Sequence, residues 1–540
     1  MASDAHSGHG EHGPQPTNSA SQVTLTENTP LISSSALPSQ QITTNLQNED
    51  AEFNDPAAFW PKVKDEFKWI TASSASMSMT YFLQYSFSFV NVLSLGHLGA
   101  KELGAAMLGT TTNNVITFAP AIGYACALDT FCSTAFTASS DKRLVGFHLQ
   151  RGLFAVVVHF LMAVPLLWNV ESILLLARQN PETAQLCGKF MKVYMLSILP
   201  WMLFECLKRF LQAQGDMKTS AKLLIFVAPI HAINNYLLVW SPTFGIGFLG
   251  SPLASAITHW TMLIGLVVYI SFSNAREAWG GFDWRFIKGI SEFYKLAIPS
   301  IAMVCCDWWA FEVLSLSASY LGSNSLAAQS IIINTVSLLF QIPAGISVAV
   351  STRVGNMLGA GRAKSSRLSA RVGIIVISTY SILSFCVFTY IQTWWGAIYT
   401  SDPKLIALVA GALPIVAISQ SFDAINITNL GIMRALGRQR LGAIISIPPY
   451  YTIMFPVGIY LAYKQPFALG VAGLWLGMAI GLSIIVICQL SFILGYVDWD
   501  NEVLICLKRL KDSGPQYGGG VKLNVESLEA ADEADPIVVV

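Results

Sequence analysis

Apolar stretches long enough to cross a bilayer recur along most of the chain, and the charged residues are concentrated in the short segments between them. A transmembrane α-helix needs about 20 mostly apolar residues. Only 12% of the 540 residues are charged, whereas about 25% is usual in a soluble domain. The sequence therefore predicts an all-α integral membrane protein with about 12 transmembrane helices. The predicted spans are residues 71–95, 104–136, 150–173, 188–207, 220–240, 251–273, 295–320, 327–357, 369–391, 404–433, 442–463 and 469–495.

Basic residues gather in alternate loops between these spans. They follow the even-numbered spans from the second to the tenth, and the other loops contain few of them. Loops rich in Lys and Arg stay in the cytosol by the positive-inside rule, so both termini are predicted to be cytosolic. The basic groups are Lys142, Arg143 and Arg151; Lys208, Arg209 and Lys218; Arg276, Arg285 and Lys288; Arg353, Arg362, Lys364, Arg367 and Arg371; and Arg434, Arg438 and Arg440.

The two halves of the chain resemble each other at a constant shift of 222 residues. This shift predicts two pseudo-symmetric six-helix bundles: an N-terminal lobe, 66–275, a cytosolic linker, 276–294, and a C-terminal lobe, 295–497. Transporters built from such halves often bind their substrate between them; a duplicated scaffold without transport is the alternative. The pairs include Ala105 with Ala327, Phe118 with Phe340, Gly123 with Gly345, Ala213 with Ala435, and Gly215 with Gly437.

Both ends of the chain lack the long apolar pattern. Residues 1–65 are rich in Ser, Thr, Gln, Asn and Pro and are predicted to form a disordered cytosolic tail. Residues 498–540 are predicted to form a second cytosolic tail. In the first tail, Glu27, Leu31 and Ile32 resemble an acidic dileucine signal, which would bind a sorting adaptor. This motif favours a vacuolar-type organelle membrane, with the plasma membrane as the alternative.

Three acids lie within predicted spans and have no Lys or Arg within one helical turn: Asp307, Glu312 and Asp423. A charge at the centre of a bilayer costs roughly 2.5–3.5 kcal/mol on insertion scales, so such residues are candidates for function. We predict that they bind protons and substrate; the alternative is that they only hydrogen-bond neighbouring helices. Asp307 and Glu312 are separated by about 140° around a helix and therefore cannot both face one point.

The other acids in or near the spans have structural explanations. Glu205 precedes Lys208 and Arg209 by one helical turn, which predicts an ion pair. Asp129 is expected to cap a helix or to pair with a base, and Glu171 to lie near the membrane interface.

Aromatic and amide side chains near the acids are candidates for a substrate cavity. Trp308 and Trp309 follow Asp307 directly and would attract an organic cation through cation–π contacts, although Trp also anchors span ends at the interface. Amides inside apolar spans line a hydrated cavity or join helices. The amide candidates are Gln84, Asn113, Asn114, Gln329, Asn334, Gln341, Gln420, Asn426 and Asn429.

Other classes of function find no support in the sequence. The net charge is zero, which gives no sign of a nucleic-acid partner. The glycine-rich segment 355–364 lacks the Gly-Lys-Ser/Thr ending of a phosphate-binding loop. No nucleophile–base pair or cluster of metal ligands is evident, so we expect neither an enzyme nor a cofactor.

Six segments together resemble the multidrug and toxic compound extrusion (MATE) family in its eukaryotic, fungal-like branch. They extend over roughly residues 70–495 in family order and include the second-half segments CCDWWAFEVLSLSASYLG and RVGNMLGAGRA. The other segments are VLSLGHLGAKELGAAMLG, ALDTFCSTAFTA, KRFLQAQG and FDAINITNLGIMRALGRQRLGA.

The resemblance implies a MATE-type fold and export of drugs or organic cations by proton antiport, although sodium is not excluded. It assigns the transport acids to Asp307, Glu312 and Asp423. This chain departs from the family in two places: the family usually has Glu where Asp307 stands, and span 1 lacks the Asp of bacterial relatives. We therefore expect coupling to rest on the second half.

Two other membrane-protein classes remain as alternatives. A major-facilitator carrier typically has a GxxxDRxGRR-like turn between spans 2 and 3, where this chain has TASSDKRLVG. A lipid-linked flippase would be expected to have a wider and more basic cavity, whereas the unpaired acids favour cations.

Overall fold

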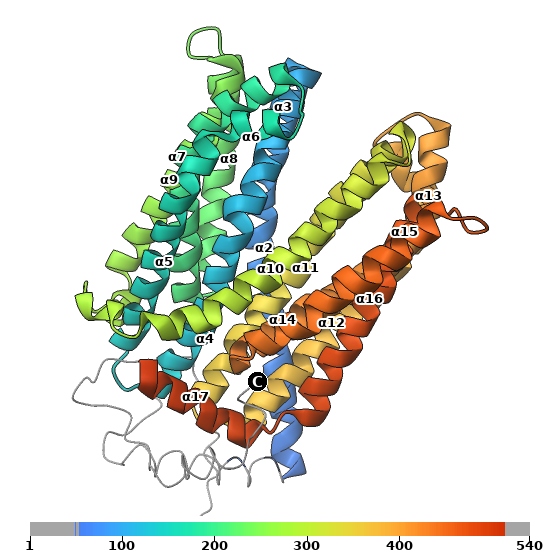
Figure 1. The fold of residues 1–540 in the computed structure, drawn as a ribbon. Helices are drawn as coiled ribbons and strands as arrows, with labels where there is room; N and C mark the ends of the chain where they lie inside the picture. The colour runs from blue at the N-terminus through green and yellow to red at the C-terminus, as the bar shows by residue number, and fades with distance from the viewer. Residues whose placement is uncertain (1–48, 50–52, 54, 514–540) are drawn as a thin grey trace, which may run out of the picture. The chain divides into compact units, whose positions relative to one another are not determined.

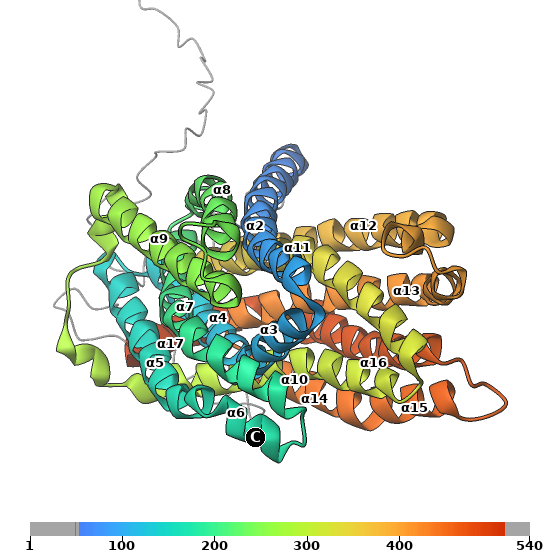
Figure 2. The same ribbon diagram turned by 90° about the horizontal axis from the view of Figure 1, so that it is seen from above.

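The computed structural model describes residues 49, 53 and 55–513, which contain α-helices but no β-strand. Two groups of helices follow one another along the chain (Figures 1 and 2). The first bundle contains α2 (Pro56–Leu98), α3 (Ala100–Asn113), α4 (Ala119–Ala138), α5 (Arg143–Trp168), α6 (Val170–Leu176), α7 (Pro181–Ala213), α8 (Thr219–Trp240) and α9 (Gly250–Phe272). The second contains α10 (Ile290–Ser319), α11 (Ser323–Gly359), α12 (Ala363–Trp395), α13 (Pro403–Leu436), α14 (Gln439–Pro448), α15 (Phe455–Tyr463) and α16 (Val471–Ser491), and α17 (Trp499–Ser513) follows it.

Three π-helical segments and several short 3₁₀ turns complete the described chain. The π-segment η1 (Asn114–Phe118) joins α3 to α4 into one span, and η6 (Pro449–Met454) joins α14 to α15. A third, η7 (Phe492–Tyr496), ends α16. Because π-segments occur often at functional sites, η1 and η6 mark positions of interest in the two bundles.

Eleven helices of the described chain are long and apolar enough to cross a membrane, and they agree with the second to twelfth predicted spans. The first predicted span, 71–95, lies within the 43-residue helix α2. This helix is rich in Ser and Thr, and some of their hydroxyls donate to carbonyls of the preceding turn, as Thr71 does to Phe67 and Thr80 to Ser76. Such internal hydrogen bonds let a less apolar helix enter the bilayer. We therefore count α2 as the first span, which brings the total to twelve.

Several long helices begin with the same local arrangement. Asp55, Asn180 and Asp402 each precede a proline, and their side chains accept hydrogen bonds from backbone N–H groups of the first turns of α2, α7 and α13. The side-chain oxygen satisfies a donor that the helix cannot, and proline loses nothing at a first helical position. The sequence thus sets these helix starts locally.

Two glycines related by the 222-residue shift bring the bundles together. A Cβ atom on Gly123 of α4 would lie 2.5 Å from the Cα of Ile301 in α10. On Gly345 of α11 it would lie 2.4 Å from the backbone nitrogen of Ser78 in α2. Each contact therefore requires glycine, and the first two spans of each bundle meet the other bundle in a pseudo-symmetric way.

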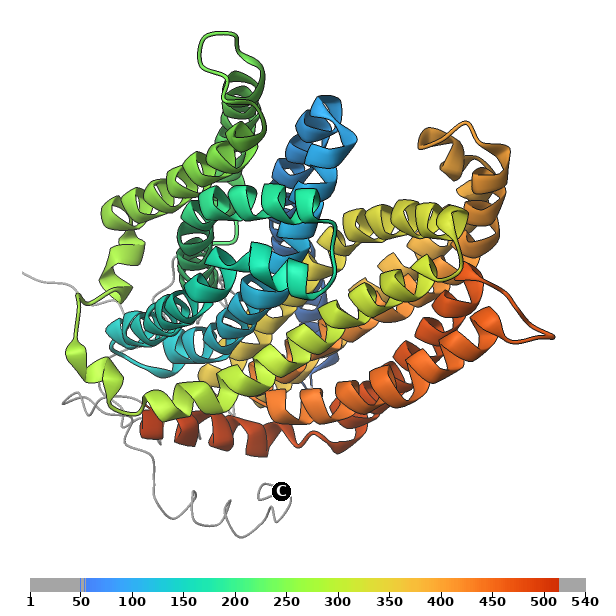
Figure 3. The same cartoon turned by 45° about the horizontal axis from the view of Figure 1, so that its top comes forward.

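Helix α17 lies across the end of the bundles that carries the basic loops, which we call the basic end (Figure 3). Trp499, Val503, Cys506, Leu507 and Leu510 are buried in the core cluster shared with the bundles. Their spacing gives the helix one apolar face.

Polar contacts fix α17 to both bundles. Arg509 donates to the carbonyl of Leu436 at the end of α13 (3.1 Å), and Arg151 of α5 donates to the carbonyl of Ser513 (2.6 Å). Residues 499–513 of the predicted C-terminal tail are therefore an ordered strap over the basic end.

The N-terminal boundary also differs from the expected one, because α2 already begins at Pro56 within the segment predicted as a tail. The dileucine-like motif at Glu27, Leu31 and Ile32 lies outside the described residues.

Candidate functional site

Asp307 points into the interior of the second bundle. It lies on α10 beside Cys306 and Ala310, both of which are buried in the core of this bundle. The hydroxyl of Tyr450, from the π-segment η6, donates a hydrogen bond to Oδ1 of Asp307. Tyr450 is itself only 1% exposed, so the carboxylate is held by a buried phenol, and no Lys or Arg among the described residues forms an ion pair with it.

Asp423 lies on α13 of the same bundle and is 1% exposed. Asn426 lies one turn further along α13, near the Asp423 carboxylate. Asn426 in turn accepts from Gln489 of α16 (2.8 Å). The charges of Asp307 and Asp423 are close enough to interact, and Tyr450 lies near both. We call Asp307, Asp423, Asn426, Tyr450 and Gln489 the C-bundle polar cluster.

The cluster retains free hydrogen-bonding capacity. Oδ1 of Asp423 is buried and has no hydrogen-bond partner within the described chain, and the same holds for Oε1 of Gln489. Nearby on α13, both side-chain polar atoms of Asn429 and Nε2 of Gln420 are also without partners there. Buried polar groups are costly when unsatisfied, so this interior is suited to bind protons, water or a cation.

Glu312 lies on a different face of α10. Ile301, Cys305 and Trp308 of that face pack against Ala119, Ile122 and Cys126 of the first bundle. Trp308 also contacts Phe118, with ring centroids 5.3 Å apart. Glu312 follows Trp308 by four residues, one turn beyond this contact, and it is exposed. The helix thus directs Asp307 into its own bundle and Glu312 towards the region above the contact with the other bundle.

The remaining cavity candidates are dispersed. Trp308 joins an aromatic group with Phe118 and Trp201, whose rings stack 3.9 Å apart. Trp309 is 42% exposed and Asn334 is also exposed, so neither lies in the C-bundle polar cluster.

Three further amides are hydrogen-bonded to neighbours, and a fourth lies in a π-segment. Gln329 accepts from Trp475 (2.8 Å), and Asn113 accepts from Thr117 (2.5 Å). Gln341 donates to the carbonyl of Ser337 (2.6 Å), and Asn114 begins the π-segment η1. Among the cavity candidates, only Asn426 belongs to the C-bundle polar cluster.

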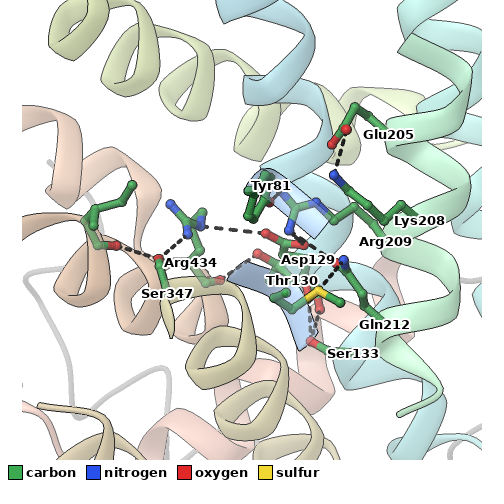
Figure 4. A network of polar contacts seen from close by, with 12 residues as sticks. Tyr81, Asp129, Thr130, Ser133, Glu205, Lys208, Arg209, Gln212, Ser347 and Arg434 are labelled. Atoms are coloured by element: carbon green, nitrogen blue, oxygen red, sulfur yellow. Dashed lines mark hydrogen bonds and ion pairs between the residues drawn. The ribbon is translucent and has the colours of Figure 1, made fainter. Parts of the chain in front are cut away.

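The first bundle contains a buried ionic network near the basic end (Figure 4). Lys208 is paired with Glu205 (2.6 Å), as the sequence predicted, and Gln84 of α2 donates to the same carboxylate (2.9 Å). Asp129 is paired with Arg209 of its own bundle (3.4 Å) and with Arg434 of the second bundle (3.8 Å).

This network joins the two bundles. The backbone carbonyl of Arg434 accepts from Thr130 (2.6 Å), and Gln439 donates to the same Thr130 hydroxyl (2.7 Å). Arg353 of α11 also forms two hydrogen bonds with Glu66 of α2, at 2.7 and 2.8 Å. These contacts hold the bundles together at the basic end.

Sequence reasoning missed Tyr450, Gln489 and Arg434. Tyr450 is one of many tyrosines in apolar runs, and Gln489 lies 63 residues from its partner Asn426. Arg434 looked like an ordinary loop base. Their roles depend on which helices pack against one another, and local sequence patterns do not predict that packing.

A search with protein-family models finds that the MatE model matches residues 77–237 and 299–463. The two segments begin 222 residues apart, which is the shift seen between the halves of the sequence. The chain belongs to the MatE family.

Related proteins match this MatE chain over most of its length. An uncharacterized transporter of Schizosaccharomyces pombe is 37% identical, covering 89% of this chain and 90% of the relative. Multidrug and toxin extrusion protein 1 of Rattus norvegicus is 32% identical, covering 88% and 81%. Membership of this transporter family excludes the major-facilitator alternative. The protein is a transporter and not an enzyme.

Solved structures agree with the fold. The crystal structure of the eukaryotic MATE transporter AtDTX14 has a TM-score of 0.77 at 27% identity, covering 83% of this chain and 100% of that one. VcmN of Vibrio cholerae has a TM-score of 0.74 at 17% identity, covering 82% and 99%. The resemblance and the all-α membrane fold predicted from the sequence are confirmed.

Proposed function

We propose that this MatE protein is a secondary active antiporter that exports organic cations or amphipathic drugs in exchange for protons. The names of the rat relative and of Protein DETOXIFICATION 16 of Arabidopsis thaliana, 33% identical to this chain, support the substrate class. The observation that carries the proposal is the C-bundle polar cluster. Its two interacting carboxylates have no ion-pair partner among the described residues, and an unpaired carboxylate inside a membrane protein is a functional candidate.

The division of α10 suggests separate tasks for its two acids. Asp307 and Asp423 share the interior of the second bundle with Tyr450 and exchange protons. Glu312, with Trp308 and Phe118 one turn below it, attracts a cationic substrate between the bundles through charge and cation–π contacts. Proton and substrate drive exchange only through different affinities in the two facing states.

Alternating access requires the basic end to open. In the described conformation this end is closed by the contacts of Arg434 with Asp129 and Thr130 and by the pair of Glu66 with Arg353. Protonation of the cluster and binding of substrate would have to stabilise a state in which these contacts are broken.

The decisive experiment is transport by proteoliposomes containing the full chain, with a fluorescent organic cation and an imposed pH gradient. Asp423→Asn is expected to abolish pH-driven uptake because it removes a proton-binding carboxylate, while the amount of reconstituted protein stays normal. Full transport by this variant would refute proton coupling at Asp423. Uptake driven by a sodium gradient at constant pH would instead assign sodium as the coupling ion.

We also propose that the termini are cytosolic and that Glu27, Leu31 and Ile32 direct the protein to a vacuolar-type membrane through a sorting adaptor. The support is the alternation of basic loops and the short motif itself. In cells, a fluorescent fusion with Leu31→Ala and Ile32→Ala is expected to move to the plasma membrane. An unchanged location would argue against the motif.

A further inference from the structure

A groove lies on the first bundle, and none of its lining residues belongs to the C-bundle polar cluster. Helices α5, α7 and α9 and the linker between α9 and α10 enclose a groove of about 990 Å³. Its walls are apolar and include Leu153, Phe154, Phe210 and Val267. Its volume is at the upper end of the usual range for small-molecule pockets, roughly 300–1,000 Å³, and its chemistry suits hydrocarbon.

The linker wall of this groove is held by buried side chains of α5. Gln150, 3% exposed, donates to the carbonyl of Gly281 (2.8 Å) and accepts from the backbone N–H of Asp283 (2.9 Å). Arg151 donates to the carbonyls of Phe286 (3.0 Å) and Lys288 (2.7 Å). Specific hydrogen bonds from buried side chains therefore fix the shape of the groove.

One lining residue supplies a positive charge. Arg276 is exposed at the groove, and no acid among the described residues forms an ion pair with it. The acid that lines the same groove, Asp283, is paired with Arg285 (2.6 Å). An apolar groove with one available guanidinium is complementary to an amphiphile with a negative head.

The groove has an aromatic rim, which is typical of segments at the level of lipid headgroups. Phe272, Phe282 and Trp284 are all at least 80% exposed. They lie where α9 ends and the basic linker begins, and Trp is enriched at membrane–water interfaces. Basic pockets between transmembrane helices on the cytoplasmic side are suited to anionic lipid headgroups.

We propose that this groove binds one anionic phospholipid, with its phosphate at Arg276 and acyl chain between α5 and α9. The site is separate from the transport acids, so the inference does not depend on the coupling ion. The bound lipid would fill the apolar walls and join the linker between the bundles to the bilayer.

Native mass spectrometry tests the proposal on the full chain, reconstituted in nanodiscs of equal parts phosphatidylglycerol and phosphatidylcholine. The wild type is expected to retain phosphatidylglycerol preferentially, and Arg276→Gln to lower its retained ratio to phosphatidylcholine at least threefold. Arg367→Gln is the matched control, because Arg367 is an exposed arginine of α12 in the other bundle. Equal retention in wild type and Arg276→Gln would overturn the role of the headgroup contact.

A second pair of variants tests the chain-binding part. Val267→Trp adds bulk to a side chain that lines the groove, and Val268→Trp does so at the adjacent exposed position that does not line it. Only Val267→Trp should lose one bound lipid per protein. Loss in both, or in neither, would show that the retained lipid does not occupy this groove. Soluble glycerol phosphate should not displace the lipid; displacement would mean that the site selects free phosphate.

Discussion

At the scale of single residues, the most informative contact joins Tyr450 to Asp307. The resemblance to the MATE family implies a Glu at this position, and Asp307 is one methylene shorter. A buried phenol nevertheless reaches the shorter carboxylate. Asp307 is therefore held in a defined position despite its reduced reach, and Tyr450 becomes part of the candidate site.

Removing this hydroxyl gives a direct test. A hydrogen bond to a charged group contributes roughly 1.5–3 kcal/mol. A free-energy difference of about 1.4 kcal/mol corresponds to a tenfold change in an equilibrium constant. Tyr450→Phe is therefore expected to slow proton-driven uptake into proteoliposomes at least tenfold. Tyr460→Phe, at an exposed position of α15, should leave the rate unchanged. Equal rates in both variants would remove Tyr450 from the site.

At the scale of elements, α10 explains how one helix serves two regions. Its face with Cys306, Ala310 and Leu314 packs within the second bundle, and its face with Ile301, Cys305 and Trp308 meets α4. Asp307 belongs to the first face, whereas Glu312 lies beyond the second. The helical period made this separation predictable, because five residues turn the direction by about 140°.

The glycine contacts of α4 and α11 provide a prediction at the same scale. Gly123→Ala would place a methyl group against the backbone of Ile301 and is expected to destabilise the described conformation by about 1–3 kcal/mol, the usual cost of overpacking. Gly345→Ala should behave alike. Gly411→Ala, where no atom lies within 4 Å of the added carbon, is the control. Thermal unfolding in detergent measures the effect, and unchanged melting of both contact variants would contradict the close approach.

At the scale of the whole molecule, the buried ionic network and α17 hold the basic end of the two bundles. Asp129, 4% exposed, is the acid placed between Arg209 and Arg434. Because these groups come from two bundles, the network stabilises one arrangement of the bundles over another. In the proposed alternating-access cycle, opening of the basic end would break this network.

Breaking this network should be costly. Asp129→Asn leaves Arg434 without this buried acid, and such losses typically cost about 3–5 kcal/mol. Glu292→Gln, which removes an ion pair with Lys295 whose lysine is largely exposed, should cost less than about 1 kcal/mol. Chemical unfolding of the reconstituted or detergent-solubilised protein compares the two. A similar loss of unfolding free energy in both variants would show that the Asp129 network stabilises the protein no more than a surface ion pair does.

The amino-acid sequence by itself determined the membrane class, the positions of the spans and the duplication, because apolar length, basic loops and a constant repeat shift are local or periodic properties. It also singled out Asp307, Glu312 and Asp423, because an acid without a nearby base is conspicuous in an apolar run. Only the tertiary structure decided that Tyr450 joins Asp307 and that Arg434 pairs across the bundles. These partners lie 143 and 305 residues apart along the chain, and packing of distant helices alone brings them into contact.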